Sequence, residues 1–346
     1  MKSERAAVKG TRGALRELSA ANARELMRNG KSVFSVLFMF GFFLILIWAL
    51  NYAINIGNRP APTVLLDGES AGASRATDEL SARSVTVVTG EDGSDAANAV
   101  VTFHGARAKV VLGSPMPNWS GIVGALEASG FANSNIAVLD AQGNPVVDLF
   151  RSNLAATLMM GYAGVAFLGT SVPLVALRRR GTLRLLGTTP LRRMTFILAQ
   201  TPIRFGIGAV QAAIVILLAV GYGYVGGAHL LRLIVTLLLG LALFFALGYL
   251  LASRSRNPDL ITQISGVLPV IVLFLSGSVF PMYILPGWVQ QAITFLPTTW
   301  FVQAASADLV GSDPFLNVYV LWAMMATATI LLTLLASKLF KWDRTE

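Results

Sequence analysis

The sequence predicts an integral membrane protein that is mostly α-helical and has six transmembrane helices with both termini cytoplasmic. A small α/β extracytoplasmic domain is expected between helices 1 and 2, and a re-entrant helical hairpin between helices 5 and 6. Three observations predict this fold. Only 13% of the 346 residues are charged, against about 25% in a soluble globular domain. Six apolar runs are each long enough to cross about 30 Å of hydrocarbon. About twenty of the 27 Lys and Arg residues fall on one predicted side of the membrane, as the positive-inside rule requires.

These runs divide the chain into five parts. We expect a cytoplasmic amphipathic segment (1–31), transmembrane helix 1 (32–54), an extracytoplasmic α/β domain (55–152), transmembrane helices 2–6 (153–340) and a cytoplasmic tail (341–346). The predicted spans are Val33–Ile54, Leu154–Leu177, Ile203–Val225, Leu230–Ala252, Leu260–Phe280 and Phe315–Leu339.

The first 31 residues are polar and basic. Between Arg12 and Arg28, leucines fall on one side of a helix and charged residues on the other, which predicts an amphipathic helix lying on the cytoplasmic leaflet. The alternative is a disordered basic tail. The first span is expected to be an uncleaved anchor, because its basic and apolar regions are too long for a signal peptide and no small-x-small site follows.

Residues 55–152 differ in character from the rest of the chain. They hold ten acidic residues against six basic ones, so they are predicted to lie outside. Short β-type runs alternate with two helical stretches, which predicts a small α/β domain. The expected strands are Thr63–Leu66, Ser84–Thr89, Lys109–Leu112 and Ile136–Leu139, and the expected helices are Asp78–Ala82 and Gly121–Ser129.

Residues 178–193 form a basic loop with the sequence RRRGTLRLLGTTPLRR, which is too polar and too broken by Gly and Pro to cross a bilayer. Its six arginines predict a cytoplasmic position. A second short loop, 253–259, is also expected inside. Within it, Asn257-Pro258 is typical of an N-cap followed by a first-turn proline, and predicts the start of the fifth span.

Residues 281–313 are apolar and aromatic but are interrupted by prolines. Each piece is too short to span, and irregular backbone at membrane depth is tolerated only against protein or water. The segment therefore predicts two re-entrant half-helices, about Gly287–Phe295 and Thr298–Leu309, with Trp288 and Trp300 near the interface. The alternative is a surface loop with interfacial helices.

Composition and motif searches exclude several functions. The chain has no cysteine, which excludes disulfides, thiol catalysis, Cys-ligated zinc and iron–sulfur clusters. His104 and His229 lie far apart in sequence and are expected to be ordinary residues. Gly30-Lys31-Ser32 lacks the earlier glycine and the preceding strand of a phosphate-binding loop. No hydrolase motif and no central membrane charge pair occurs, which disfavours an intramembrane enzyme and a secondary transporter. The formal charge of +9 is distributed as topology demands, which disfavours nucleic-acid binding.

Two groups of motifs resemble a known family. Arg180-Gly181-Thr182-Leu183 followed by Thr189-Pro190 is similar to the R-G-T-L-x-x-L-x-x-T-P motif of type-2 ABC exporter permeases. Further along, Ser276-Gly277 with Phe280-Pro281, then Pro286-Gly287-Trp288, then Leu296-Pro297-Thr298, resemble that family's C-terminal pattern. The resemblance covers about 150–340. The chain departs from the family at Arg178 and Arg179, where members often carry an acidic residue.

The resemblance implies a permease subunit of an ATP-driven ABC exporter that is not itself an enzyme and holds no cofactor of its own. ATP and Mg would be bound by a separate ABC ATPase subunit. The other expected partners are a second permease, which is the same chain or a related one, and membrane lipids. The expected location is the plasma membrane of a bacterium, as a multi-pass protein. The expected substrate is amphipathic: a drug, a lipid, a lipid-linked compound or a peptide.

The resemblance also implies two sets of site residues. The loop that couples to the ATPase would use Arg180, Gly181, Thr182, Leu183, Arg184, Leu186, Pro190, Arg192 and Arg193. A possible substrate exit would use Phe280, Tyr283, Trp288, Trp300 and Phe301. The arginines of the loop could instead only enforce topology. The alternative function is a membrane-anchored sensor or assembly factor whose outer domain binds a ligand.

Overall fold

A computed structural model gives the fold of the chain. It describes residues 17–24, 30–55, 60–67, 71–83, 85–88, 97–105, 107–114, 116–131, 135–143, 146, 148–182, 185, 188, 193–222, 224–225, 227–255, 257–275, 286–312 and 314–340. The chain forms two compact units. The helical unit comprises Met1–Leu44, Leu154–Asp308 and Pro314–Glu346, and the α/β unit comprises Ile45–Asn153 and Leu309–Asp313.

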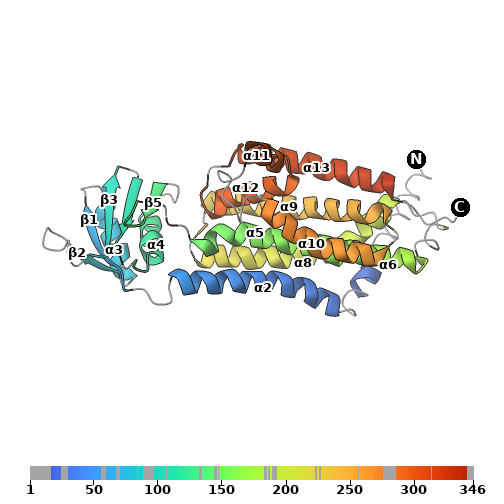
Figure 1. Cartoon of the computed structure of the whole chain (residues 1–346), viewed down its shortest axis with the longest axis horizontal. Helices are drawn as coiled ribbons and strands as arrows, with labels where there is room; N and C mark the ends of the chain where they lie inside the picture. The colour runs from blue at the N-terminus through green and yellow to red at the C-terminus, as the bar shows by residue number, and fades with distance from the viewer. Residues whose placement is uncertain are drawn as a thin grey trace, which may run out of the picture. The chain divides into compact units, whose positions relative to one another are not determined.

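The α/β unit is built on a five-stranded sheet in the order β2-β1-β3-β4-β5 (Figure 1). Its elements are β1 (Thr63–Asp67), α3 (Ala71–Ala82), β2 (Thr86–Val88), β3 (Ala99–His104), β4 (Arg107–Leu112), α4 (Ser120–Ala128) and β5 (Ile136–Leu139). The β3–β4 pair is antiparallel, and the other neighbouring strands are parallel. The connection from β3 to β4 turns at Gly105, whose φ of 61° suits glycine.

The core of this unit lies on one face of the sheet. Alternate residues of β3 and β4 are buried, as the two-residue period of a strand requires. Val101 and Val110 pack there in one cluster with Leu80 of α3 and Leu126 of α4. The four strands expected from the sequence coincide with β1, β2, β4 and β5. The central strand β3 was missed.

The helical unit consists mainly of long apolar helices. Its elements are α2 (Gly30–Asn55), α5 (Leu149–Ala163), the π-helical segment η3 (Gly164–Ser171), α6 (Val172–Arg179), α8 (Arg193–Gly221), α9 (Gly227–Arg254), α10 (Pro258–Leu275), α11 (Gly287–Thr294), α12 (Pro297–Leu309) and α13 (Val318–Leu339). Residues 45–55 of α2, 149–153 of α5 and Leu309 of α12 are assigned to the other unit. Among the described residues, five helices are long and apolar enough to cross a membrane: α2, the continuous helix α5–η3–α6, α8, α9 and α13.

Helix α10 is shorter than these five. Its apolar part is Asp259–Phe274, which rises about 24 Å at 1.5 Å per residue, and residues 276–280 of the predicted span lie outside the described residues. Its start is confirmed. Asn257 accepts hydrogen bonds from the backbone N–H groups of Asp259 at 3.0 Å and Leu260 at 3.3 Å, so it caps a helix that opens on Pro258.

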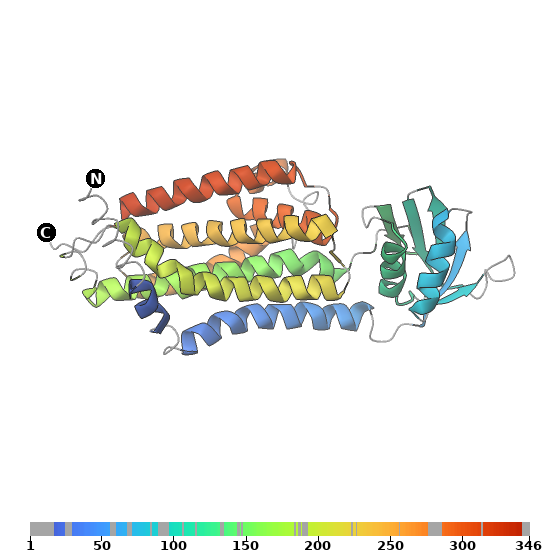
Figure 2. The same ribbon diagram turned by 180° about the vertical axis from the view of Figure 1, so that it is seen from behind.

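Helix α8 runs from Arg193 to Gly221, and its apolar stretch Ala199–Gly221 overlaps the predicted span Ile203–Val225. Pro202 lies inside this helix, where it removes one backbone hydrogen bond. Helical residues 17–24 lie beside this point (Figure 2). There the carbonyl of Ala199 accepts hydrogen bonds from Ser19 at 3.1 Å and Asn22 at 3.3 Å. The N-terminal helix thus contributes hydrogen bonds next to the proline.

Helix α9 lies at the centre of the helical unit. It packs against α13, η3 and α8, and Leu237, Leu241 and Phe244 along it are buried. Two glycines let its neighbours approach closely. A Cβ added at Gly248 would lie 2.5 Å from the carbonyl oxygen of Ala166, and one at Gly240 would lie 2.1 Å from the Phe301 ring. Small residues at these two positions set how closely η3 and α12 can pack on α9.

Candidate functional site

The coupling loop was predicted to span 178–193, but its first two residues, Arg178 and Arg179, form the end of α6, so the loop starts at Arg180. Arg179 is the last residue of α6, and Gly181 follows with φ 73°. Its N–H bonds to the Arg178 carbonyl at 3.0 Å, which is typical of a glycine that ends a helix in the left-handed conformation. The sequence therefore stops α6 with a glycine and directs the chain into the 180–193 segment.

The exposed part of the loop combines an apolar side chain with positive charge. Leu185 is 72% exposed. Its backbone groups are bonded to the described residues on either side: the N–H of Leu185 bonds to the Gly181 carbonyl at 3.3 Å, and the Thr188 hydroxyl donates to the Leu185 carbonyl at 2.7 Å. Arg180 is exposed and Thr182 is half-buried. The exposed side chain of Leu185 is therefore available for contact with another protein.

The other residues predicted for the loop fall outside this description. Residues 183, 184, 186, 190 and 192 are not among the described positions, and Arg193 opens α8 without a described side chain. Nearby, Arg179 forms an ion pair with Asp259 of α10 at 3.5 Å, with both side chains largely exposed. Such exposed pairs contribute less than about 1 kcal/mol.

The three predicted exit residues that the structure describes, Trp288, Trp300 and Phe301, differ in exposure. Phe280 and Tyr283 lie outside the described residues. Trp288 on α11 is 74% exposed, whereas Phe301 on α12 is fully buried. Phe301 packs in an aromatic cluster with Tyr162 at 5.5 Å and Phe244 at 5.9 Å between ring centroids.

The remaining predicted exit residue, Trp300, is half-buried, and its indole N–H donates to the Thr294 carbonyl at 2.7 Å. That bond joins α11 to α12 across Pro297. The two half-helices expected from the sequence therefore correspond to α11 and α12, and α12 is the member of the pair that is packed into the helical unit.

Several buried polar side chains were missed at the sequence level. Arg204 of α8 is 6% exposed and donates to the Gly169 carbonyl in η3 at 2.9 Å and to Gln200. Ser171 of η3 donates to the Gly248 carbonyl of α9 at 2.7 Å. A π-helix has a hydrogen-bond pattern different from its flanking turns and often marks a functional position. Here its groups are bonded to α8 and α9.

A second polar cluster lies at the N-terminal end of α9. The Asp308 side chain is fully buried and accepts a hydrogen bond from Arg232 at 2.6 Å, and Nδ1 of His229 lies 3.2 Å from the same carboxylate oxygen. The Trp322 indole donates to Thr236, whose hydroxyl donates to the Arg232 carbonyl. These bonds connect α9 to α12 and α13. No three His, Asp or Glu side chains come together as a metal site would need in the part of the chain that the structure describes.

Comparison with protein families decides the kind of protein. A family model described as ABC-2 family transporter protein matches residues 122–338, which include both the 178–193 loop and the 281–313 segment. The chain belongs to the ABC-2 transporter family. No curated protein matches this chain.

Membership explains the architecture of the helical unit. The ABC-2 domain is the membrane component of an ABC transporter and lacks an ATP-binding cassette, so the family works with an ATPase partner. The chain is a multi-pass membrane protein. The family range begins within α4 and ends within α13, so it contains every described helix of the helical unit after α2.

Proposed function

We propose that this chain is the permease subunit of an ATP-driven exporter. It has six transmembrane helices, and α10 belongs to the fifth. Both termini and the 178–193 loop lie in the cytoplasm, and the α/β unit lies outside the plasma membrane of a bacterium. A separate ATPase binds ATP and Mg, and the permease pairs with a second permease. The substrate is an amphipathic molecule: a drug, lipid, lipid-linked compound or peptide.

The observation that carries this proposal is the Gly181 turn with its exposed Leu185. A leucine that is 72% exposed, in a stretch of sequence rich in arginine, suits a groove with an apolar floor and an acidic rim. Burying a leucine contributes about 1.5–3 kcal/mol, and the arginines select an acidic partner. ATP-driven closure of two ATPases would then displace these loops, and the helices behind them would switch substrate access from inside to outside.

The test is purification of the tagged chain from its native membrane with its bound proteins. A soluble ATPase should copurify in a ratio near one to one. Leu185→Asp should reduce the retained ATPase about tenfold or more, because it buries a charge in an apolar contact. Arg107→Glu, which changes an exposed arginine on β4, is the control and should retain the partner.

Absence of an ATPase from the wild-type preparation would contradict the exporter proposal and favour the sensor or assembly-factor alternative. Full retention of the ATPase by Leu185→Asp would contradict the assignment of the docking loop while leaving the family unchanged.

A further inference from the structure

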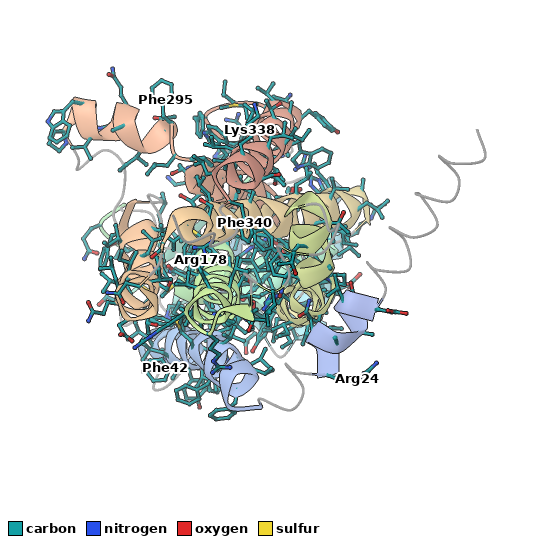
Figure 3. All side chains as sticks on the ribbon, turned by 90° about the vertical axis from the view of Figure 1, so that its right-hand side faces the viewer. Arg24, Phe42, Arg178, Phe295, Lys338 and Phe340 are labelled. Atoms are coloured by element: carbon teal, nitrogen blue, oxygen red, sulfur yellow. The ribbon has the colours of Figure 1, made fainter. Side chains whose placement is uncertain are left out.

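Arg178 differs from its two arginine neighbours in where its side chain lies. Arg179 and Arg180 are exposed, whereas Arg178 is 3% exposed and points into the bundle (Figure 3). A buried guanidinium is costly unless its donors are bonded. Arg178 donates to the carbonyls of Ala252 and Ser253 at 3.1 Å each, and also to the carbonyl of Ser255.

These acceptors lie at the C-terminal end of α9, where carbonyl groups lack partners within their own helix. That end also carries the negative pole of the helix dipole. A guanidinium offers five donors in a planar fork and is suited to bond several such carbonyls at once. Arg178 of α6 therefore caps a different helix, α9, and joins the two helix ends.

A third helix end meets the same side chain. The Arg178 guanidinium lies over the ring of Phe340 at 5.4 Å from its centroid, close enough for a cation–π contact. Phe340 directly follows α13, is buried, and its N–H bonds to the Ala336 carbonyl at 2.9 Å. Its ring also packs on Phe196 of α8, with centroids 5.8 Å apart. The ends of α6, α9 and α13 are thus held together by one arginine.

We propose that Arg178 is the positioning residue that transmits displacement of the 180–193 loop to α9 and α13. This rests on the proposed function, in which the loop receives the movement of the ATPase. Arg178 lies two residues before the loop and three before the Gly181 turn. When the end of α6 moves, its bonds carry the end of α9 and the Phe340 ring with it. Without Arg178, the same displacement would be taken up by α6 alone.

The absence of cysteine from the chain makes a site-specific test direct. Thr188→Cys places a spin label on the loop at an exposed residue that is not the docking leucine, and Leu335→Cys places one on α13, at a side chain that is 44% exposed. Spectra are recorded on the purified complex with its ATPase, with and without ATP and vanadate. In the protein with Arg178 intact, nucleotide should change the spectrum at both positions.

In Arg178→Gln, the loop label should respond as before and the ATPase should remain bound, but the α13 response should fall about fivefold or more, the scale of an ordinary coupling between sites. Arg178→Lys should recover part of it, because lysine keeps the charge but lacks the planar fork and the stacking surface. Arg179→Gln is the matched control and should leave both responses unchanged, since that side chain is 65% exposed.

The outcomes separate the inference from the function. An undiminished α13 response in Arg178→Gln, with the loop still responding, overturns the role of Arg178 and leaves the exporter proposal intact. Absence of a nucleotide response at both positions with Arg178 present counts against the exporter proposal itself. If Arg178→Gln gives no monodisperse complex, the same spectra are recorded on Phe340→Leu and Arg178→Lys. An undiminished α13 response in both of these variants overturns the inference.

Discussion

In the part of the chain that the structure describes, the buried arginines and Asp308 are each held by specific partners. Arg178 and Arg204 bond to backbone carbonyls of neighbouring helices. Arg232 bonds to the buried carboxylate of Asp308, and Arg151 of the α/β unit pairs with Glu127 at 2.8 Å. The sequence shows these arginines only as charges near helix ends, because which side of a helix turns inward depends on packing that periodicity does not specify.

Asp308 is the residue that a sequence search for membrane charge pairs overlooks. It lies in a stretch broken by prolines, so no continuous apolar run surrounds it and its burial is hidden. Its partner Arg232 is separated from it by 76 positions. A pairing at that distance in the chain comes from tertiary structure alone.

Asp308→Asn should lower the stability of the purified protein by roughly 2 kcal/mol, because hydrogen bonds to charged groups contribute about 1.5–3 kcal/mol and this carboxylate is fully buried. Thermal unfolding in detergent, followed by tryptophan fluorescence, measures the change. Asp259→Asn removes the exposed partner of Arg179 and should shift stability by less than about 0.5 kcal/mol. Equal shifts in stability for both variants would show that the buried Asp308–Arg232 pair stabilises the protein no more than the exposed Arg179–Asp259 pair.

At the scale of elements, close packing of α9 on η3 depends on one glycine. Gly248→Ala should destabilise the protein by about 1–3 kcal/mol, the usual cost of overpacking. The added Cβ would lie 2.5 Å from the backbone oxygen of Ala166. A backbone atom cannot relieve this overlap by changing rotamer, as a side chain can.

Gly206→Ala is the matched change for Gly248→Ala, since it lies in α8 with nothing within 4 Å of the added Cβ. It should be neutral or stabilising by up to about 1 kcal/mol through helix propensity. The melting temperatures of the two variants provide the comparison, and a Gly248→Ala protein as stable as Gly206→Ala would mean that the helices separate without cost.

The sequence predicted elements well where one physical signal dominated. Apolar runs located the long helices, and Asn257-Pro258 located the start of α10. The ends of the spans were less exact: the predicted Ile203–Val225 corresponds to the apolar stretch Ala199–Gly221 of α8. The alternation of Val101 and Phe103 before the Gly105 turn would have revealed β3, which is the strand that joins both halves of the sheet.

The candidate site was predictable only in part. The R-G-T motif indicated the loop, and Gly181 does turn the chain there. The position of Arg178 was not predictable, because three consecutive arginines look alike in sequence while each residue of a helix faces about 100° from the last. Burial of Phe301 likewise follows from its aromatic neighbours on α5 and α9, which are remote in sequence.

At the scale of the whole molecule, the proposed topology places the α/β unit and the 178–193 loop on opposite sides of the membrane. Single cysteines at Gln142 and Thr188, both exposed, report this without background from other thiols. A membrane-impermeant maleimide should label Gln142→Cys in intact cells and Thr188→Cys only after permeabilisation. The reverse pattern, or labelling of both in intact cells, would contradict the topology.

Helix α9 carries one arginine contact near each end, and their spacing restricts how it can move. Ala252, which binds Arg178, follows Arg232 by twenty residues, or about 30 Å along the helix axis. That is about the thickness of the hydrocarbon core, and no charged residue lies between the two contacts. Sliding α9 by one turn along the membrane normal would draw one guanidinium into hydrocarbon, at a cost on the order of 3 kcal/mol or more. The two arginine contacts therefore oppose movement of α9 along its own axis more strongly than they oppose its rotation or tilt.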